Sequence, residues 1–162
     1  MSQELRLALI AALSALLGTV VGGMIGYYTN RDLQDIQFKR EESQRLRQAR
    51  SVASLERYRF QTAEGALAPM LVRGGTRPPI PTELEAQVNG SDQQLVLSYL
   101  DQKGIAAYAN GRLCVSLLVR ELPAGVSTTP IRKDELPLYR NWAHCIKAAD
   151  DAMATVVARR VP

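Results

Sequence analysis

An uncharged stretch, residues 7–28, constrains this chain of 162 residues more than any other feature of its sequence. About twenty apolar residues, each adding about 1.5 Å to a helix, are enough to cross a lipid bilayer. Tyr27 and Tyr28 close the stretch and Arg31 follows soon after, which is typical of a membrane helix that reaches the headgroups. The sequence therefore predicts one transmembrane helix over residues 7–28, behind a short tail of residues 1–6.

A cleaved secretory signal is the alternative interpretation of this stretch. A signal peptide begins with basic residues, has a shorter apolar segment and ends in a small-residue cleavage site. Here Glu4 stands beside Arg6, and the apolar run is longer than a signal peptide needs. We therefore favour the transmembrane helix.

Basic residues are distributed unevenly around the predicted span. Arg6 precedes it, and the set that follows, with a predicted role at the membrane surface, is Arg31, Lys39, Arg40, Arg45 and Arg47. An excess of cationic residues marks the cytoplasmic side of a membrane helix. The expected protein is thus a single-pass protein of the cell (inner) membrane, with its N-terminus outside and its C-terminal domain in the cytoplasm.

Small residues recur at every fourth position of the predicted span. They are Ser14, Gly18, Gly22 and Gly26. Residues four apart share one face of a helix, and a face without large side chains lets a second helix approach closely. The pattern favours packing against another transmembrane helix, from a second copy or a partner subunit, so the predicted partners are this helix and the lipid bilayer. The alternative is that small residues are simply common in membrane helices.

Residues 29–50 are strongly polar and contain neither glycine nor proline. Charges of opposite sign at positions such as Glu41 and Arg45 support an exposed helix. We expect a charged helical stalk here. Its basic side chains could lie on anionic headgroups, or the stalk could be a solvated spacer, and the sequence favours neither.

The remaining residues, 51–162, have the periodicity of an antiparallel three-helix bundle. The predicted helices cover residues about 51–73, 92–122 and 131–160, and a loop over residues 74–91 holds a short helix at 82–88. The last helix could begin near Pro130 or, with Pro137 in its first turn, near Glu135. Few aromatic residues (6%) and much alanine and leucine also favour helices over strands, so the predicted fold class is all-α.

Apolar residues spaced three and four apart define the expected core of the bundle. In the first helix they are Val52, Leu55, Tyr58, Ala63, Ala66, Leu67, Met70 and Leu71. In the second and third helices the leading core positions are Leu100, Ala107, Cys114, Leu118, Trp142, Ile146, Ala149 and Met153. Pro69 predicts a kink or an early end of the first helix. Gly104 and Gly111 predict a close helix contact or, alternatively, a break in the second helix.

The sequence offers no recognisable catalytic, cofactor or metal motif. His144 is the only histidine and has no second ligand set nearby in sequence. The pair Asp150 and Asp151 is expected to be solvated helix surface, and Cys114 and Cys145 are expected to be reduced, buried thiols. Acidic residues interleave with basic ones despite the formal charge of +4, which argues against nucleic-acid binding. We expect no enzyme activity, no cofactor, no metal and no small-molecule substrate.

The order of these features resembles small uncharacterised single-pass membrane proteins of bacteria, especially actinobacteria. The residues that carry the likeness are the glycine-rich helix, the charged segment 39–47, the proline-rich loop 77–81 and the segment 105–108. The resemblance implies architecture and no activity. Phage inner-membrane spanins look similar in layout, although the broken helices and the stalk charges here argue against them.

A membrane-anchored helical interaction module is the function that these patterns favour. It would be an accessory or structural subunit of a membrane complex, or a self-associating protein. The alternative is a signalling protein or a phage-type lysis protein that acts at the membrane.

Overall fold

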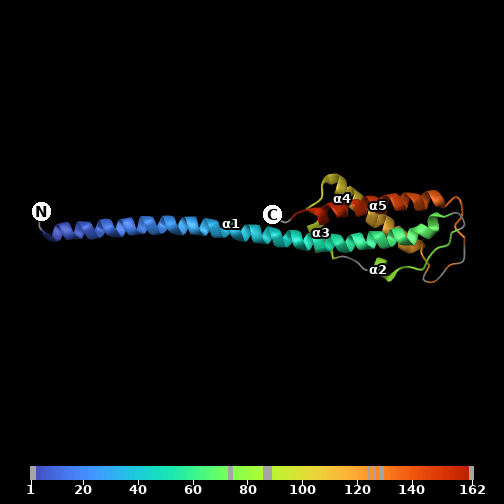
Figure 1. The fold of residues 1–162 in the computed structure, drawn as a ribbon, viewed down its shortest axis with the longest axis horizontal. Coiled ribbons are helices and arrows are strands. Elements are labelled where there is room, and N and C mark those ends of the chain that lie inside the picture. The colour runs from blue at the N-terminus through green and yellow to red at the C-terminus, as the bar shows by residue number, and fades with distance from the viewer. Residues whose placement is uncertain are drawn as a thin grey trace. The chain divides into compact units, whose positions relative to one another are not determined.

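The computed structural model describes residues 3–72, 75–85, 89–123, 125, 127 and 130–160, with the side chains of 3–13 and 85 excepted. The described residues are all-α and contain no strand, only an isolated antiparallel bridge between Thr76 and Pro130 (Figure 1). The chain divides into two compact units, unit 1 ending at Gln44 and unit 2 covering residues 45–161. The predicted fold class is therefore confirmed at the level of all-α.

The first helix, α1, covers Gln3–Leu67 and contributes to both units. Within the described residues, no helix is both long and apolar enough to cross a membrane. A helix needs about twenty predominantly apolar residues to cross a bilayer, and α1 does not offer such a run within its described part. The prediction of a transmembrane helix is therefore wrong for the part of the chain that the structure describes.

The predicted location depended on the same helix and is corrected with it. A single-pass placement in the inner membrane, with the N-terminus outside and the C-terminal domain in the cytoplasm, requires a spanning helix. Because none is found in the described residues, the positions of the basic side chains no longer indicate an orientation.

Within unit 2, α1 buries one regular stripe of its surface. Arg59 and Ala66 are buried beside this stripe, whose own positions are Leu46, Ala49, Ala53, Glu56, Phe60, Ala63 and Leu67, followed by Met70 just beyond the helix. Their spacing alternates between three and four residues, which keeps them on a single helical face. Leu55 and Tyr58, which we expected in the core, are more than half exposed, so that part of the predicted face is wrong.

Proline ends α1 as the sequence indicates. The chain continues from Leu67 into a short 3-10 helix, η1, over Ala68–Leu71, with Pro69 in its first turn. Proline lacks the backbone N–H that an α-helix needs and its ring clashes with the carbonyl four residues back. Of the two outcomes expected at Pro69, a kink or an early end, the early end is found, so the predicted bound of the helix at about residue 73 is too late.

The following loop contains α2, Thr82–Glu85, where a short helix was expected over 82–88. Residues 86–88 lie outside the described part of the chain. Arg77 anchors the loop because its Nη2 donates to Glu135 Oε1 at 2.8 Å and to Tyr139 Oη at 3.1 Å. The backbone N–H of Ile131 adds a hydrogen bond to the carbonyl of Gly75 at 2.7 Å.

The second predicted helix is two helices, α3 over Gly90–Leu97 and α4 over Gln102–Glu121. Asp101 separates them because its Oδ1 accepts a hydrogen bond from the backbone N–H of Gly104 at 2.7 Å, which caps the start of α4. The single helix predicted over 92–122 is therefore wrong. The break falls just before Gly104 and not at either glycine.

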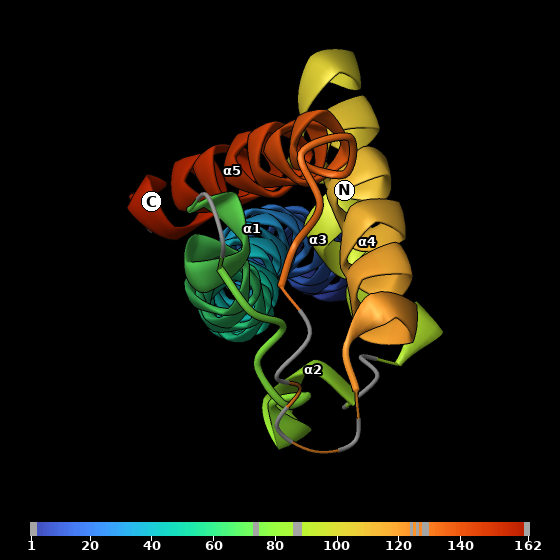
Figure 2. The ribbon, with the colours of Figure 1, turned by 90° about the vertical axis from the view of Figure 1, so that its right-hand side faces the viewer.

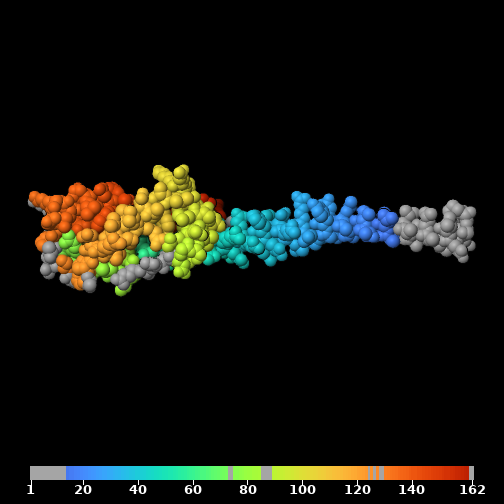
Figure 3. Space-filling model, turned by 180° about the vertical axis from the view of Figure 1, so that it is seen from behind, coloured from blue at the N-terminus to red at the C-terminus, as the bar shows by residue number. Residues whose placement is uncertain are grey.

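The last helix, α5, covers Leu136–Ala158 and has Pro137 in its first turn, so the later of the two expected starting points is correct. It packs closely along α4, and Figure 2 shows these two helices beside each other. Gly111 makes this possible, since a Cβ atom there would clash with the Cβ of Ala149. In the space-filling view, α4 in yellow to orange forms much of one face of unit 2 (Figure 3).

Candidate functional site

Unit 1 carries the small residues that the sequence singled out. Ser14, Gly18, Gly22 and Gly26 lie on α1 and are exposed. A Cβ atom built on any of these three glycines would meet no atom within 4 Å outside its own turn of helix. The face they form is therefore open and smooth, as a close helix neighbour would require.

Large apolar side chains are exposed along the same unit. They are Leu16, Leu17, Val20, Val21, Met24, Ile25, Tyr27, Tyr28, Leu33, Ile36 and Phe38. Soluble proteins rarely expose contiguous apolar surface on this scale unless it binds something. We call this surface of residues 16–38 the apolar helix surface.

The basic residues predicted at a membrane surface are also exposed. They are Arg31, Lys39, Arg40, Arg45 and Arg47, the last two of which belong to unit 2. Their exposure is what any solvated helix face would show. Their predicted role at a membrane surface depended on the spanning helix, which is not found among the described residues.

Most of the predicted core positions lie in the core of unit 2. Cys114, Leu118, Trp142, Ile146, Ala149 and Met153 are buried. Leu100 and Ala107 are half-buried and pack against the same core. Two aromatic pairs strengthen it: the rings of Phe60 and Tyr108 meet edge to face at 6.1 Å, and those of Tyr139 and Trp142 at 5.5 Å.

Both cysteines are free thiols, Cys114 buried and Cys145 half-buried. Burial, followed by a hydrogen bond with Cys145, raises the pKa of Cys114 to about 12. A thiol with such a pKa is protonated at neutral pH and a poor nucleophile. His144 is exposed, and no group of three residues that could hold a metal ion occurs among the described residues.

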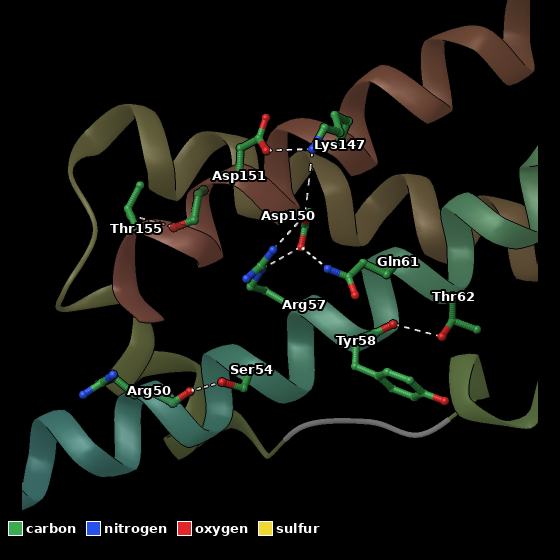
Figure 4. Close-up of polar contacts among 11 residues, drawn as sticks. Arg50, Ser54, Arg57, Tyr58, Gln61, Thr62, Lys147, Asp150, Asp151 and Thr155 are labelled. Atoms are coloured by element: carbon green, nitrogen blue, oxygen red, sulfur yellow. Dashed lines mark hydrogen bonds and ion pairs between the residues drawn. The ribbon is translucent and has the colours of Figure 1, made fainter. Parts of the chain in front are cut away.

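Asp150 corrects one expectation, because it is buried and not part of a solvated acidic pair. Arg57 donates two hydrogen bonds to the Asp150 carboxylate, from Nε to Oδ1 at 2.9 Å and from Nη2 to Oδ2 at 3.4 Å (Figure 4). Gln61 and Lys147 approach the same carboxylate at 3.5 and 3.9 Å. This network joins α1 to α5 and is a structural link, while Asp151 remains largely exposed.

A second buried polar group lies on the core stripe of α1. Glu56 is 1% exposed and Arg59 is 9% exposed. Arg59 Nη1 donates to Glu56 Oε1 at 3.4 Å, and Nη2 donates to the backbone carbonyl of Leu84 at 3.1 Å. The Nε of Arg59 is buried and has no hydrogen-bond partner among the described residues. Because the donors of a buried charged group normally have hydrogen-bond partners, the unpaired Nε of Arg59 is unusual.

Tyr108 and Arg112 extend this polar group onto α4. The guanidinium of Arg112 lies over the ring of Tyr108, 5.8 Å from its centroid. Burial, with the neighbouring charge of Glu56, raises the pKa of Tyr108 to about 12. Its hydroxyl is therefore neutral at physiological pH; it is buried near Glu56 and Arg112 and, within the described residues, forms no hydrogen bond of good geometry.

These residues surround a cavity of about 280 Å³ between α1, α2 and α4. Its lining is Glu56, Arg59, Phe60, Leu84, Arg112, Val115, Ser116, Val119 and Arg120. Three arginines and one glutamate give the lining a formal charge of +2. We call it the arginine cavity.

The sequence patterns did not predict the arginine cavity. One signal was available: Glu56 continues the spacing Leu46, Ala49, Ala53 and Phe60, which places a carboxylate on a buried stripe. The larger apolar residues Leu55 and Tyr58 instead predicted burial of a helix face that is exposed in the structure. The arginines of α4 carry no sequence signal of their own, because arginine at helical spacing is usually solvated.

Comparisons with known proteins give no further guide to this arrangement. The chain matches no protein-family model, no curated protein and no solved structure.

Proposed function

We propose that this protein is a non-enzymatic interaction module that assembles through the apolar helix surface. The observation that carries the proposal is the exposure of large apolar side chains along residues 16–38 of α1, with Leu16, Leu17 and Phe38 each more than 60% exposed. Burying such side chains typically stabilises a complex by about 1.5–3 kcal/mol each before the costs of association are counted.

Helix stability supports the need for a partner. Isolated helices are marginal in water, because most helical stability in proteins comes from packing an apolar face. Gly18, Gly22, Gly23 and Gly26 weaken this segment further, by about 1 kcal/mol each relative to alanine. A second helix packed against the segment would offset that loss.

The occupant that fits best is α1 of a second copy of the chain. Ser14, Gly18, Gly22 and Gly26 form a groove without side-chain ridges, and two such grooves are self-complementary. In this proposal the finer architecture of unit 2, an antiparallel three-helix bundle of α1, α4 and α5, is the scaffold that carries the assembling helix. A different partner protein, for which this chain would be an accessory subunit, is the alternative outcome.

Size-exclusion chromatography with light scattering on the full chain tests the proposal. We expect a dimer or larger assembly whose mass falls on dilution, and we expect Gly22→Leu to disrupt it. Gly65→Leu is the matched control, because Gly65 is an exposed helical glycine in unit 2 with open space around it. A full chain that is monomeric at every concentration excludes self-assembly, and an assembly that Gly22→Leu leaves intact excludes the glycine groove as its contact.

A further inference from the structure

The arginine cavity lies wholly in unit 2 and is independent of the apolar helix surface. We propose that it binds a small organic anion, whose phosphate or carboxylate group is held by Arg59, Arg112 and Arg120. Guanidinium groups bind oxyanions through pairs of parallel N–H donors, which makes arginine the usual residue for this purpose.

The lining of the arginine cavity carries positive charge that no neighbouring carboxylate among the described residues balances. Glu56 pairs with Arg59, with Nη1 of Arg59 3.4 Å from Oε1 of Glu56. Neither Arg112 nor Arg120 forms an ion pair within the part of the chain that the structure describes. Arg112 is half-buried and Arg120 is exposed, and together with Arg59 they give the cavity a positive potential. The cavity therefore favours a ligand with negative charge.

Arg59 has one hydrogen-bond donor, its Nε, without a partner among the described residues. The residue is 9% exposed and its side chain 11%, and its Nε has no acceptor among the described residues although Nη1 and Nη2 each have one. Leaving a buried donor unpaired is costly, and a ligand oxygen would remove that cost. The guanidinium is already held in place by Glu56 and Leu84, so little side-chain entropy would be lost on binding.

Polar side chains of α4 line the cavity in a regular row. Arg112, Ser116 and Arg120 are spaced four residues apart, so they form one row of donors on a single helical face. Phe60, Leu84 and Val115 supply an apolar wall. A row of donors facing an apolar wall suits a ligand with an acidic group and a small hydrocarbon part. A volume of about 280 Å³ lies at the lower end of small-molecule sites and is too small for a macromolecule.

Isothermal titration calorimetry on the full chain tests this site, with phenyl phosphate as the probe and phenol as its uncharged counterpart. We expect saturable binding of one phenyl phosphate per chain and none of phenol. Arg112→Gln and Arg120→Gln should each weaken the binding by about tenfold to a hundredfold, as expected for a charge-assisted hydrogen bond. Absence of saturable phenyl phosphate binding overturns the proposal.

Two further variants separate this site from general attraction to a basic protein. Arg140→Gln makes the same charge change at an exposed position of α5 outside the cavity and should leave the affinity unchanged. Glu56→Gln keeps a side-chain oxygen that can accept the hydrogen bond from Arg59 but removes the negative charge of the lining, so it should tighten the binding. Equal weakening by Arg140→Gln and Arg120→Gln contradicts the proposal, and so does weaker binding by a Glu56→Gln variant with native circular dichroism. Because Arg120 is exposed, its replacement keeps the test valid even where Arg112→Gln unfolds the chain.

Discussion

Residues 14–44 and residues 45–67 belong to the same helix, yet their side chains meet opposite environments. In unit 1, side chains as apolar as Leu17 and Phe38 are exposed. In unit 2, the helix buries alanines, Phe60 and even the carboxylate of Glu56. Burial of a side chain on α1 therefore depends on which elements pack against its face of the helix and not on the hydrophobicity of its segment. It also separates the two proposals, since assembly belongs to unit 1 and anion binding to unit 2.

Two phenylalanines on α1 test the comparison most strongly. Phe60 is 1% exposed and Phe38 is 68% exposed. We expect Phe60→Ala to lower the free energy of unfolding of unit 2 by about 3–5 kcal/mol, because it leaves a cavity in a packed core. Phe38→Ala should leave that quantity unchanged. Urea denaturation followed by circular dichroism measures both, and equal effects would mean that the two segments do not differ as described.

The two neighbouring aspartates of α5 sharpen the comparison between buried and solvated charge. Asp150→Asn removes the charge that Arg57 grips with two donors and should cost about 1.5–3 kcal/mol. Asp151→Asn, at a side chain 65% exposed, should cost less than about 0.5 kcal/mol. The same denaturation experiment decides between them. A cost for Asp151→Asn as large as that for Asp150→Asn would show that burial is not what distinguishes the pair.

Two helical glycines extend the test to backbone packing. Gly111→Ala should destabilise unit 2 by about 1–3 kcal/mol, because the added methyl group clashes with the Cβ of Ala149. Gly65→Ala has open space and should stabilise the protein by up to about 1 kcal/mol, since alanine restricts the unfolded chain. Thermal unfolding gives both signs in one experiment. Stabilisation by Gly111→Ala would contradict the close approach of α4 and α5.

Alkaline pH provides the most specific test of the unit 2 core. The pKa values of Cys114 and Tyr108 are raised to about 12 in the folded protein from ordinary values of 9.0 and 10.0. A raised pKa means that the folded state holds its proton more tightly, so this stability is complete below about pH 9 and is lost between about pH 9 and pH 12. We expect the melting temperature to fall over that range.

Tyr108→Phe isolates the contribution of the tyrosine. The variant lacks the buried hydroxyl, so the loss of stability between about pH 10 and pH 12 should become smaller. At neutral pH its free energy of unfolding should change by less than about 1 kcal/mol, because the hydroxyl makes no hydrogen bond within the described residues. A pH profile identical to that of the original chain would show that the ionisation of Tyr108 does not limit alkaline stability.

Local sequence signals predicted the helix ends that depend on local chemistry. Pro69 ends α1 and Pro137 opens α5, because proline restricts the backbone whatever surrounds it. The break between α3 and α4 escaped prediction although its signal, Asp101 three residues before Gly104, is also local. The apolar residues on both sides of that break continued at helical spacing and concealed it.

Length and hydropathy misled where they were applied to the N-terminal segment. The predicted span of residues 7–28 was defined by its lack of charge, but no helix among the described residues is long and apolar enough to cross a membrane. The same emphasis on large apolar residues selected Leu55 and Tyr58 for the core and omitted Ala49 and Ala53, although Ala63 of the same stripe was predicted correctly.

The sequence by itself determined that this protein is all-α and where prolines limit its helices, because backbone preferences act within a few residues of the chain. Only the tertiary structure decided which face of α1 is buried, that Asp150 is held by Arg57, and that three arginines from two helices line one cavity. Those outcomes depend on residues far apart in the chain, such as Arg57 and Asp150, which form an ion pair, or Arg59 and Arg112, which line the same cavity. The energy of such contacts is set by the environment that the whole fold creates, which no local pattern encodes.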